Sequence, residues 1–163
     1  MAHGAAQADT LSDIKAHKVI KVAIDLGNPP FGFKGPNLEA EGYDVNTAQL
    51  LAQDLGVKLE IVPTTGPNRI PFLISNRADI VISTLAVTPE RQQVIDFSMP
   101  YAAVLKVLAA PVSMNIHTPA DLAGKRIAAT RGTTNDVAVT KVAPPSAQIV
   151  RVDDEATTLT SVT

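Results

Sequence analysis

The sequence predicts an α/β protein in which helices cover both faces of a parallel sheet. Short apolar runs, rich in β-branched residues, alternate along the chain with stretches of helical periodicity, and Thr-Pro or glycine signals mark several helix ends. Strands that alternate with helices are typical of βαβ units, whose strands run parallel. Hydrophobic residues make up 45% of the 163 residues, which is enough for a buried core in one ordinary domain or two small lobes.

The first half of the chain begins with a strand, a loop and a helix. Residues 19–24 are an apolar run of strand type, and the prolines within residues 27–30 require a loop because proline lacks the backbone donor of a strand. Between Asp44 and Gly56 the apolar residues share one helical face, Asp44 suits the N-cap and Gly56 suits the C-terminal stop. Residues 57–62 return to the alternation of a strand.

Four further elements complete this half. Pro67 suits the first turn of a second helix that runs to about residue 76, and residues 79–82 form a buried strand. Thr88, followed by proline, is typical of an N-cap and starts a third helix. The long apolar stretch of residues 101–110 predicts another strand.

The pattern then restarts. Thr118, also followed by proline, starts a helix, with an acidic residue three positions later as a weak capping box. Residues 125–129 and 148–152 are predicted strands, and residues 132–143 lead into a helix between them. The acidic residues 153–155 are attributed to the start of a last helix rather than to a cation site.

These elements divide into two lobes. Residues 10–108 are expected to form the first lobe and residues 109–163 the second, which is predicted to be incomplete because the chain stops inside a helix without a C-cap signal. Residues 1–9 are small and polar, and Ala-Gln-Ala at positions 6–8 resembles an export-signal cleavage site without a basic or apolar segment before it. We expect either the remnant of a removed signal peptide or a disordered tail.

The composition excludes several classes of function. A net charge of −2 and a pI near 5.9 argue against nucleic acid as a partner, because polyanion binders concentrate basic residues. No apolar run reaches the ~18 residues of a membrane span. The lack of cysteine excludes disulfides, thiolate zinc sites and thiol catalysis, and the three histidines have no partners at metal-ligand spacing. We therefore expect no metal, no cofactor and no catalytic residue.

Polar and aromatic residues gather in three loops that follow predicted strands, which is where open parallel sheets bind ligands. The first loop is rich in aromatic residues, the second carries two hydroxyls and an arginine, and the third carries an arginine, a glycine and two threonines. Hydroxyls and N-terminal helix amides are able to hold an anion. The candidate ligand-binding residues in these loops are Phe31, Ser83, Thr84, Arg91, Arg131, Thr133 and Thr134.

Each candidate also has an ordinary structural explanation. Phe31 is equally suited to pack under its loop, and hydroxyls at strand ends, such as Ser83 and Thr84, commonly bond the backbone. Arg91 lies in the first turn of a helix, where a surface salt bridge is the usual outcome; beside free N–H groups and two hydroxyls, it also suits a carboxylate receptor. Arg131 is either a solvated surface charge or a second ligand contact.

Several segments occur together in a characteristic order. They are residues 79–91 with 95–101, the Pro-Pro-Phe loop, Gly42-Tyr43-Asp44-Val45 at the start of the first predicted helix, and residues 121–126 before Gly132-Thr133-Thr134. In this order they resemble the extracellular solute-binding proteins of amino-acid ABC transporters, family 3. The resemblance extends over essentially the whole chain from residue 10.

This resemblance implies a periplasmic-binding-protein type II fold, with the first lobe largely present, in which two α/β lobes close over an amino acid. By position, Arg91 would clamp the α-carboxylate, assisted by Ser83 and by Thr133 of the second lobe. The other implied contacts are Asn28, Phe31, the backbone around Ala86, and Arg69, which is alternatively a surface charge. Hinge strands are expected near residues 102–110, an ABC transporter permease as the partner, and the periplasm as the location.

Two departures from the family pattern affect these expectations. Ala86 stands where family members often carry serine or threonine, so one hydroxyl contact is lost. Family members also continue past residue 163 into a second-lobe strand that bears the acidic partner of the ligand's α-ammonium, and they then return to complete the first lobe. We therefore expect weak or absent amino-acid binding by this chain, and pairing with a second copy through exposed strand edges.

Two alternatives stay open. A dehydratase of the cyclohexadienyl or arogenate type, built on the same fold, would need a general acid in the cleft, and the three loops supply no such carboxylate. Turnover of a prephenate-like acid would favour that enzyme. A truncated fragment that mainly associates with itself would instead show a raised mass in solution, both with and without amino acids.

Overall fold

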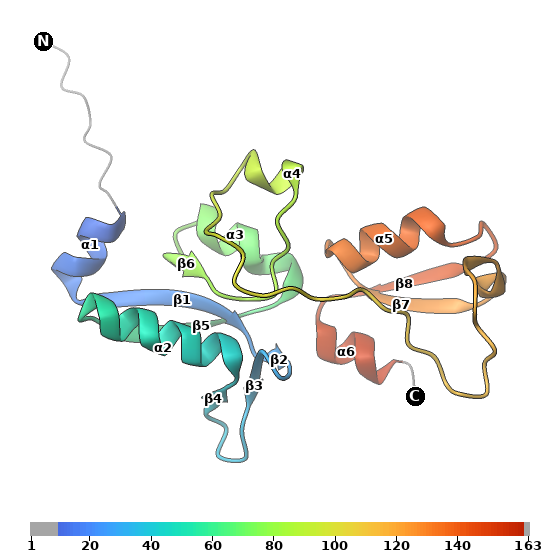
Figure 1. The fold of residues 1–163 in the computed structure, drawn as a ribbon, viewed down its shortest axis with the longest axis horizontal. Helices are drawn as coiled ribbons and strands as arrows, with labels where there is room; N and C mark the ends of the chain where they lie inside the picture. Colours follow the sequence, from blue (N-terminus) through green and yellow to red (C-terminus); the bar gives the residue numbers. More distant parts are fainter. Residues whose placement is uncertain (1–9, 162–163) are drawn as a thin grey trace, which may run out of the picture.

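The computed structural model describes residues 10–161, which form two α/β units joined by a long connecting segment (Figure 1). The first unit comprises residues 10–92, the second unit comprises residues 119–160, and residues 93–118 connect them. Each unit has its own parallel sheet with helices against it, which confirms the predicted α/β class. The lobe boundary predicted near residue 108 falls within the connecting segment.

The first unit is built around β1 (Val19–Asp25). This strand lies between β5 (Lys58–Thr64) and β6 (Ile80–Val81), and both neighbours run parallel to it. Residues 22–24 of β1 expose no surface at all. A strand that is buried on both faces has no solvent side to favour polar residues, which explains its nearly continuous apolar sequence.

Helices cover both faces of this sheet. On one face, Ile20, Val22 and Ile24 form a cluster with the apolar sides of α1 and α2; on the other, Ala23 packs with Phe72 of α3. The sequence did not predict α1, and the second predicted helix is a short 3₁₀ turn followed by a shorter α-helix. The elements are α1 (Thr10–His17), α2 (Tyr43–Leu55), η1 (Gly66–Asn68), α3 (Arg69–Ile74) and α4 (Pro89–Gln92).

The helix ends confirm most of the predicted caps. Gly56 ends α2 in the left-handed conformation with φ 64°, and the hydroxyl of Thr88 accepts the N–H of Arg91 at 3.3 Å at the start of α4. The prediction that Asp44 caps α2 is wrong. Gly42 occupies the N-cap, and Asp44 is buried within the first turn because its carboxylate bonds a residue of the connecting segment.

A small antiparallel ribbon follows β1, where the sequence predicted only a loop. It consists of β2 (Gly27–Asn28), β3 (Gly32–Lys34) and β4 (Ala40–Glu41). A Cβ atom on Gly32 would collide with the backbone oxygen of Asp25, so the close return of the ribbon to the end of β1 depends on a glycine. The turn between β2 and β3 thereby holds the first aromatic loop at the end of the sheet.

The second unit contains the parallel pair β7 (Arg126–Thr130) and β8 (Gln148–Val152). The helices α5 (Thr134–Val142) and α6 (Glu155–Thr160) lie on opposite sides of this pair (Figure 1). A 3₁₀ helix, η2 (Pro119–Leu122), precedes β7. The predicted strands and helices of this region are therefore present, except that a 3₁₀ helix replaces the helix predicted from Thr118.

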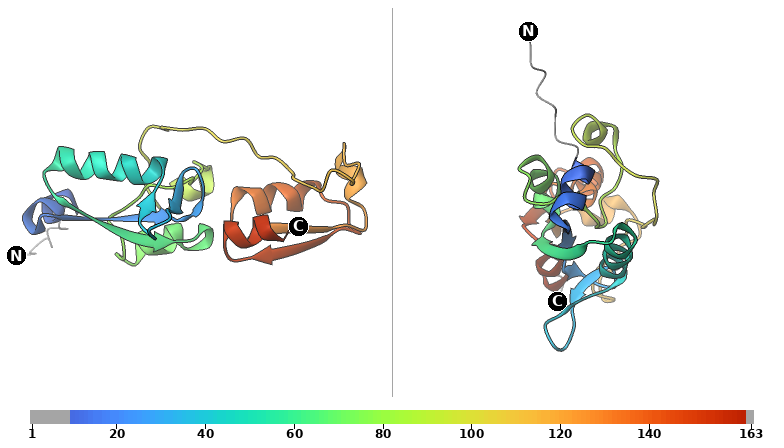
Figure 2. Two further views of the ribbon diagram at one scale, coloured as in Figure 1. Left: turned by 90° about the horizontal axis from the view of Figure 1, so that it is seen from below. Right: turned by 90° about the vertical axis from the view of Figure 1, so that its left-hand side faces the viewer.

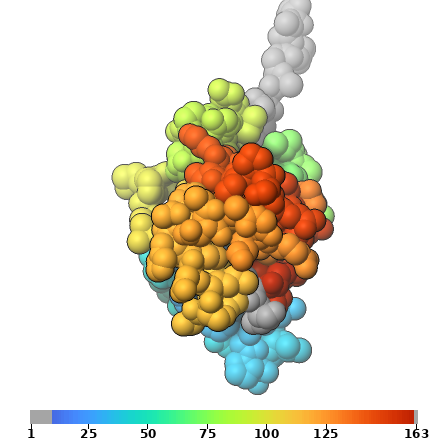
Figure 3. Space-filling view, turned by 90° about the vertical axis from the view of Figure 1, so that its right-hand side faces the viewer, coloured from blue at the N-terminus to red at the C-terminus, as the bar shows by residue number. Residues whose placement is uncertain are grey.

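The connecting segment contradicts the strand that was predicted over residues 101–110. It contains no strand and runs from one unit to the other along one side of the molecule (Figure 2). Its last part lies against α5, as the yellow-to-orange surface in Figure 3 shows. Apolar content alone does not make a strand, because a strand needs a hydrogen-bonded neighbour and nothing in the described chain pairs with this segment.

No helix within residues 10–161 combines the length and the apolarity needed to span a bilayer. The predicted export-signal remnant or disordered tail, residues 1–9, lies outside the described residues.

Candidate ligand-binding cavity

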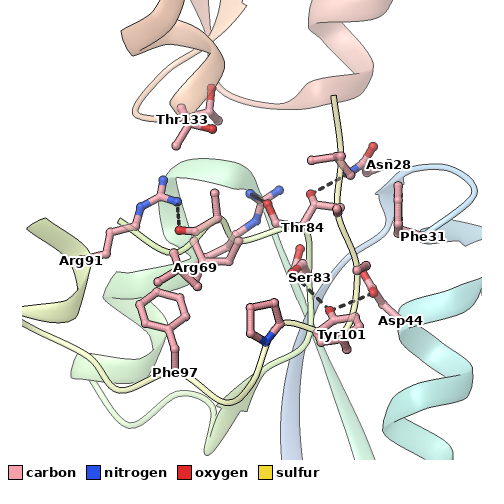
Figure 4. A pocket seen from close by; sticks show the side chains of 18 of the residues that line it. Asn28, Phe31, Asp44, Arg69, Ser83, Thr84, Arg91, Phe97, Tyr101 and Thr133 are labelled. Carbon is pink, nitrogen blue, oxygen red and sulfur yellow. Dashed lines mark hydrogen bonds between the residues drawn. The ribbon is translucent and has the colours of Figure 1, made fainter. Parts of the chain in front are cut away.

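A cavity of about 570 Å³ lies between the two units, at the carboxyl ends of β1 and β6 (Figure 4). The turns that follow these strands supply its floor, and the start of α5 and α6 supplies part of its opposite wall. Nine of the ten predicted site residues line it together. They are Asn28, Phe31, Arg69, Ser83, Thr84, Ala86, Arg91, Thr133 and Thr134.

Arg91 projects from α4 into the cavity, with its guanidinium directed toward the second unit (Figure 4). Its Nη1 donates to the carbonyl of Ala86 at 2.8 Å, and its Nη2 donates to the carbonyl of Gly132 at 3.4 Å. No carboxylate of residues 10–161 forms an ion pair with it. Burial, and then the positive charge of Arg69, lower the pKa of Arg91, so a bound anion would stabilise its charged form.

Arg69 also lines the cavity, but its charge is already neutralised. Its Nη2 lies 3.0 Å from Oδ2 of Asp25 and 3.0 Å from Oε1 of Glu155, and its Nη1 donates to the carbonyl of Thr84 at 3.4 Å. Only 3% of the Arg69 side chain is exposed, so the alternative interpretation as a surface charge is wrong. The two carboxylates make Arg69 a less suitable anion receptor than Arg91.

The hydroxyls on the cavity floor differ in how they are used. Oγ1 of Thr84 accepts a hydrogen bond from Nδ2 of Asn28 at 2.9 Å, which connects the first two predicted loops. Ser83 is buried, and its Oγ has no partner within the described residues. A buried hydroxyl without a partner is costly, so Ser83 has an unused donor and acceptor beside the cavity.

Three aromatic residues line the cavity: Phe31, Phe97 and Tyr101. Tyr43, outside the cavity, supports two of them: it stacks on Tyr101 with ring centroids 6.1 Å apart and meets Phe31 edge to face at 6.5 Å. The Tyr101 hydroxyl donates to Oδ1 of Asp44 at 3.1 Å and lies 3.4 Å from the carbonyl oxygen of Ser83. Burial and the charge of Asp44 raise the pKa of Tyr101, so this hydroxyl remains a donor at neutral pH.

The second unit contributes less than the sequence predicted. The Thr133 hydroxyl caps α5: it donates to the carbonyl of Thr130 at 2.8 Å and accepts the N–H of Asp136 at 3.2 Å. Arg131 lies outside the cavity. More than half of its side chain is exposed, and it pairs with Asp153 at 3.3 Å, so the structure favours the surface charge over the ligand contact for this residue.

Glu155 is one of the cavity residues, with Asp44, Phe97 and Tyr101, that the sequence interpretation did not assign to the site. Its neighbour Asp154 caps α6, as expected of an acidic helix start, but the Glu155 side chain extends into the cavity and reaches Arg69 of the first unit. Burial is the main cause of the raised pKa of Glu155. The carboxylates that line the cavity, Asp44 and Glu155, therefore come from outside the three predicted loops, and residues 10–161 hold no cluster of three groups suited to a metal ion.

Comparison with known sequences identifies the family. Residues 20–159 match the bacterial extracellular solute-binding proteins, family 3. The chain belongs to this family. For this solute-binding protein, the fold inferred from the resemblance, a periplasmic-binding-protein fold of which part is present, is confirmed by its similarity to solved amino-acid-binding proteins.

Its relatives include binding proteins and an enzyme. The octopine-binding periplasmic protein of Rhizobium meliloti is 34% identical over a region that covers 68% of this chain and 42% of its own length. The cyclohexadienyl dehydratase of Pseudomonas aeruginosa is 38% identical over a region that covers 59% of this chain and 36% of its own length. The crystal structure of an ancestral amino acid-binding protein, a precursor of cyclohexadienyl dehydratase, shares 34% identity with a TM-score of 0.88, covering 94% of this chain and 69% of that one. The chain thus spans about half the length, or less, of these curated relatives.

Proposed function

We propose that this solute-binding protein binds a small amino acid or a related carboxylate in the periplasm and delivers it to an ABC transporter permease. The observation that carries the proposal is the Arg91 guanidinium, which lines a cavity between two units and has no carboxylate partner within the described chain. The buried, unpartnered hydroxyl of Ser83 lines the same cavity. Together they offer a planar double donor and a hydroxyl to a carboxylate.

The position of this site between the units supports a role in transport. Arg91 belongs to the first unit, yet it also bonds the carbonyl of Gly132 in the second. A ligand held at Arg91 would therefore favour the arrangement in which the two units approach one another. Closure of two lobes around a ligand is a recurrent way to change the surface that a partner recognises, here the permease.

The test is a calorimetric titration of the twenty amino acids, with NMR for millimolar binders. For any amino acid that binds, Arg91→Ala is expected to weaken the affinity at least tenfold, because a charged hydrogen bond contributes about 1.5–3 kcal/mol. Arg131→Ala is the matched control, since it removes an arginine outside the cavity and should leave the affinity unchanged. Unaltered binding by Arg91→Ala would remove Arg91 from the site.

An enzymatic function is the second candidate. It is favoured by the dehydratase relative and by Glu155, a carboxyl group whose raised pKa suits proton donation in the cavity. Incubation with a prephenate-like acid tests it: loss of water and carbon dioxide from the acid would support an enzyme. The absence of turnover, with amino-acid binding that depends on Arg91, would leave the transport proposal in place.

A further inference from the structure

Glu155, whose side chain is 21% exposed, supplies a carboxylate beyond the one that Arg69 needs. Asp25 already pairs with Arg69 at 3.0 Å, and both side chains are 3% exposed. Glu155 adds a second carboxylate at 3.0 Å on the same nitrogen, Nη2, so the three ionised side chains together carry one net negative charge. An excess negative charge in such a cluster is unfavourable unless another cation or hydrogen-bond donor contacts the carboxylates.

The second oxygen of Glu155 shows where such a group is needed. Oε1 accepts from Arg69, whereas Oε2 is buried and has no partner within the described residues. Nε of Arg69 is buried and unpartnered as well. The cluster therefore has one unused acceptor, on its glutamate, and one unused donor, on its arginine. Burial raises the pKa of Glu155, and the nearby Asp25 carboxylate raises it further, whereas Arg69 lowers it, so the ionised form of Glu155 is only partly compensated within the cluster.

The fold brings this carboxylate into the proposed binding cavity. Glu155 is the first residue of α6, and it lines the cavity together with Arg91 and Ser83. A Cβ atom on Gly66 would lie 2.8 Å from Oε1 of Glu155, so the close approach of the glutamate depends on the small residue facing it. The cavity therefore presents a guanidinium without an acidic partner and a carboxylate with one unused oxygen.

We propose that Glu155 is a specificity-determining residue that accepts a hydrogen bond from a ligand ammonium on its free oxygen. The inference rests on the proposed function, since it requires that Arg91 hold the carboxylate of the same ligand. An ammonium would complete the hydrogen bonds of Oε2 and neutralise the excess charge of the cluster. The ammonium belongs either to the α-carbon of the ligand or to the end of its side chain.

A matched set of five-carbon acids tests the proposal and separates these two sources. Pentanoate carries only the carboxylate, 2-aminopentanoate adds an α-ammonium, 5-aminopentanoate adds a terminal ammonium, and ornithine carries both. By NMR titration, the unmodified protein is expected to bind at least one of the ammonium-bearing acids ten times or more tightly than pentanoate. Whichever aminopentanoate shows this preference identifies the position of the ammonium that Glu155 recognises.

Glu155→Gln keeps the shape of the side chain and an oxygen for Arg69 but removes the charge. It should weaken binding of the preferred ammonium-bearing acid at least tenfold and change pentanoate binding by less than twofold. Asp153→Asn is the matched control, because it makes the same chemical change at an exposed carboxylate outside the cavity and should alter neither.

Four results would overturn the proposal. Equal weakening of all four acids by Glu155→Gln would mean that Glu155 only holds the two units together, and unchanged binding would mean that it makes no contact with the ligand. Pentanoate binding that is weakened by Arg91→Ala, without any preference for an ammonium in the unmodified protein, would refute the role of Glu155 and leave that of Arg91 in place. Failure of all four acids and of the twenty amino acids to bind would refute the proposed function as well.

Discussion

The two units of the molecule differ in how deeply their strands are buried. In the first unit, β1 is covered on both faces, and its residues from Val22 to Ile24 are fully buried. In the second, every residue of β8 keeps some exposed surface, and α5 leaves Val137 67% exposed. The first unit is thus a well-packed platform on which side chains have fixed positions, whereas the second relies on fewer buried apolar contacts.

The same difference appears where the units meet. The contacts between them include Glu155 with Arg69 and the Gly132 carbonyl with Arg91, both of which are polar. Polar contacts of this kind are common between parts that change their relative position, whereas a large apolar interface holds parts fixed. Arg91 and Ser83 therefore have positions set by the first unit, and the second unit adds Glu155 when the two are close.

The largest expected effect comes from breaking the buried Arg69–Asp25 ion pair of the first unit. Arg69→Met removes the cation between Asp25 and Glu155, so Asp25 would be left as a buried charge without an ionic partner. Removing one member of a buried pair typically destabilises by about 3–5 kcal/mol. We expect a loss of this size in the free energy of unfolding, measured by urea titration with circular dichroism.

Arg131→Met is the control for that variant. Arg131 forms a solvent-exposed pair with Asp153 in the second unit, and such pairs contribute about 0–1 kcal/mol. Equal losses for the two variants would contradict the burial difference on which the comparison of the units depends.

The second prediction compares apolar side chains of the two units. Ile24→Ala removes a side chain that is fully buried in β1, and we expect it to lower the free energy of unfolding by about 2–5 kcal/mol because it leaves a cavity. Val137→Ala removes an exposed side chain of α5 and should change the same quantity by about 0.5 kcal/mol or less. A loss at Val137 as large as that at Ile24 would show that the second unit has a buried surface there.

Local patterns account for what could be predicted from the sequence. Strands such as β1 and β8 were predicted because their apolar and β-branched residues are contiguous, and the starts of α4 and α5 because threonine signals an N-cap beside its helix. Six of the cavity residues were predicted in the same way, because the strand-end loops that carry them can be recognised locally, whereas Asn28, Arg69 and Ala86 were implied only by the family resemblance.

The errors concern partners that lie far apart in the sequence. The burial of Arg69 depends on Asp25, 44 residues earlier, and on Glu155, 86 residues later, and no local pattern indicates either pair. Similarly, the apolar stretch of residues 101–110 was predicted to be a strand although it has no strand neighbour. A glutamate at a helix start has an ordinary local explanation, which is why the cavity carboxylate was missed.

A smaller effect than those of Arg69→Met and Ile24→Ala is predicted in the helix that carries Glu155. Asp154 caps α6: its Oδ1 accepts the N–H of Thr157 at 2.7 Å, and its Oδ2 accepts the Thr157 hydroxyl at 2.8 Å. Asp154→Ala should lower the stability of α6 by about 1 kcal/mol, which would be measured as faster amide hydrogen exchange in α6 at neutral pH. Asp154→Asn should retain most of the stabilisation, because asparagine is also a good N-cap.

The pH dependence separates the charge of this cap from its shape. The hydrogen bonds from Thr157 lower the pKa of Asp154 below its ordinary value of 3.8, so the carboxylate binds fewer protons in the folded protein than in the unfolded one. Its stabilising effect is therefore present above pH 3.8 and is lost as the pH falls through the folded pKa. The difference in α6 exchange free energy between the unmodified protein and Asp154→Ala should shrink over that range, whereas the difference between Asp154→Asn and Asp154→Ala should stay nearly constant. If both differences stayed constant on acidification, the cap would act through its geometry alone, and Glu155 would be held in the cavity without help from the charge of Asp154.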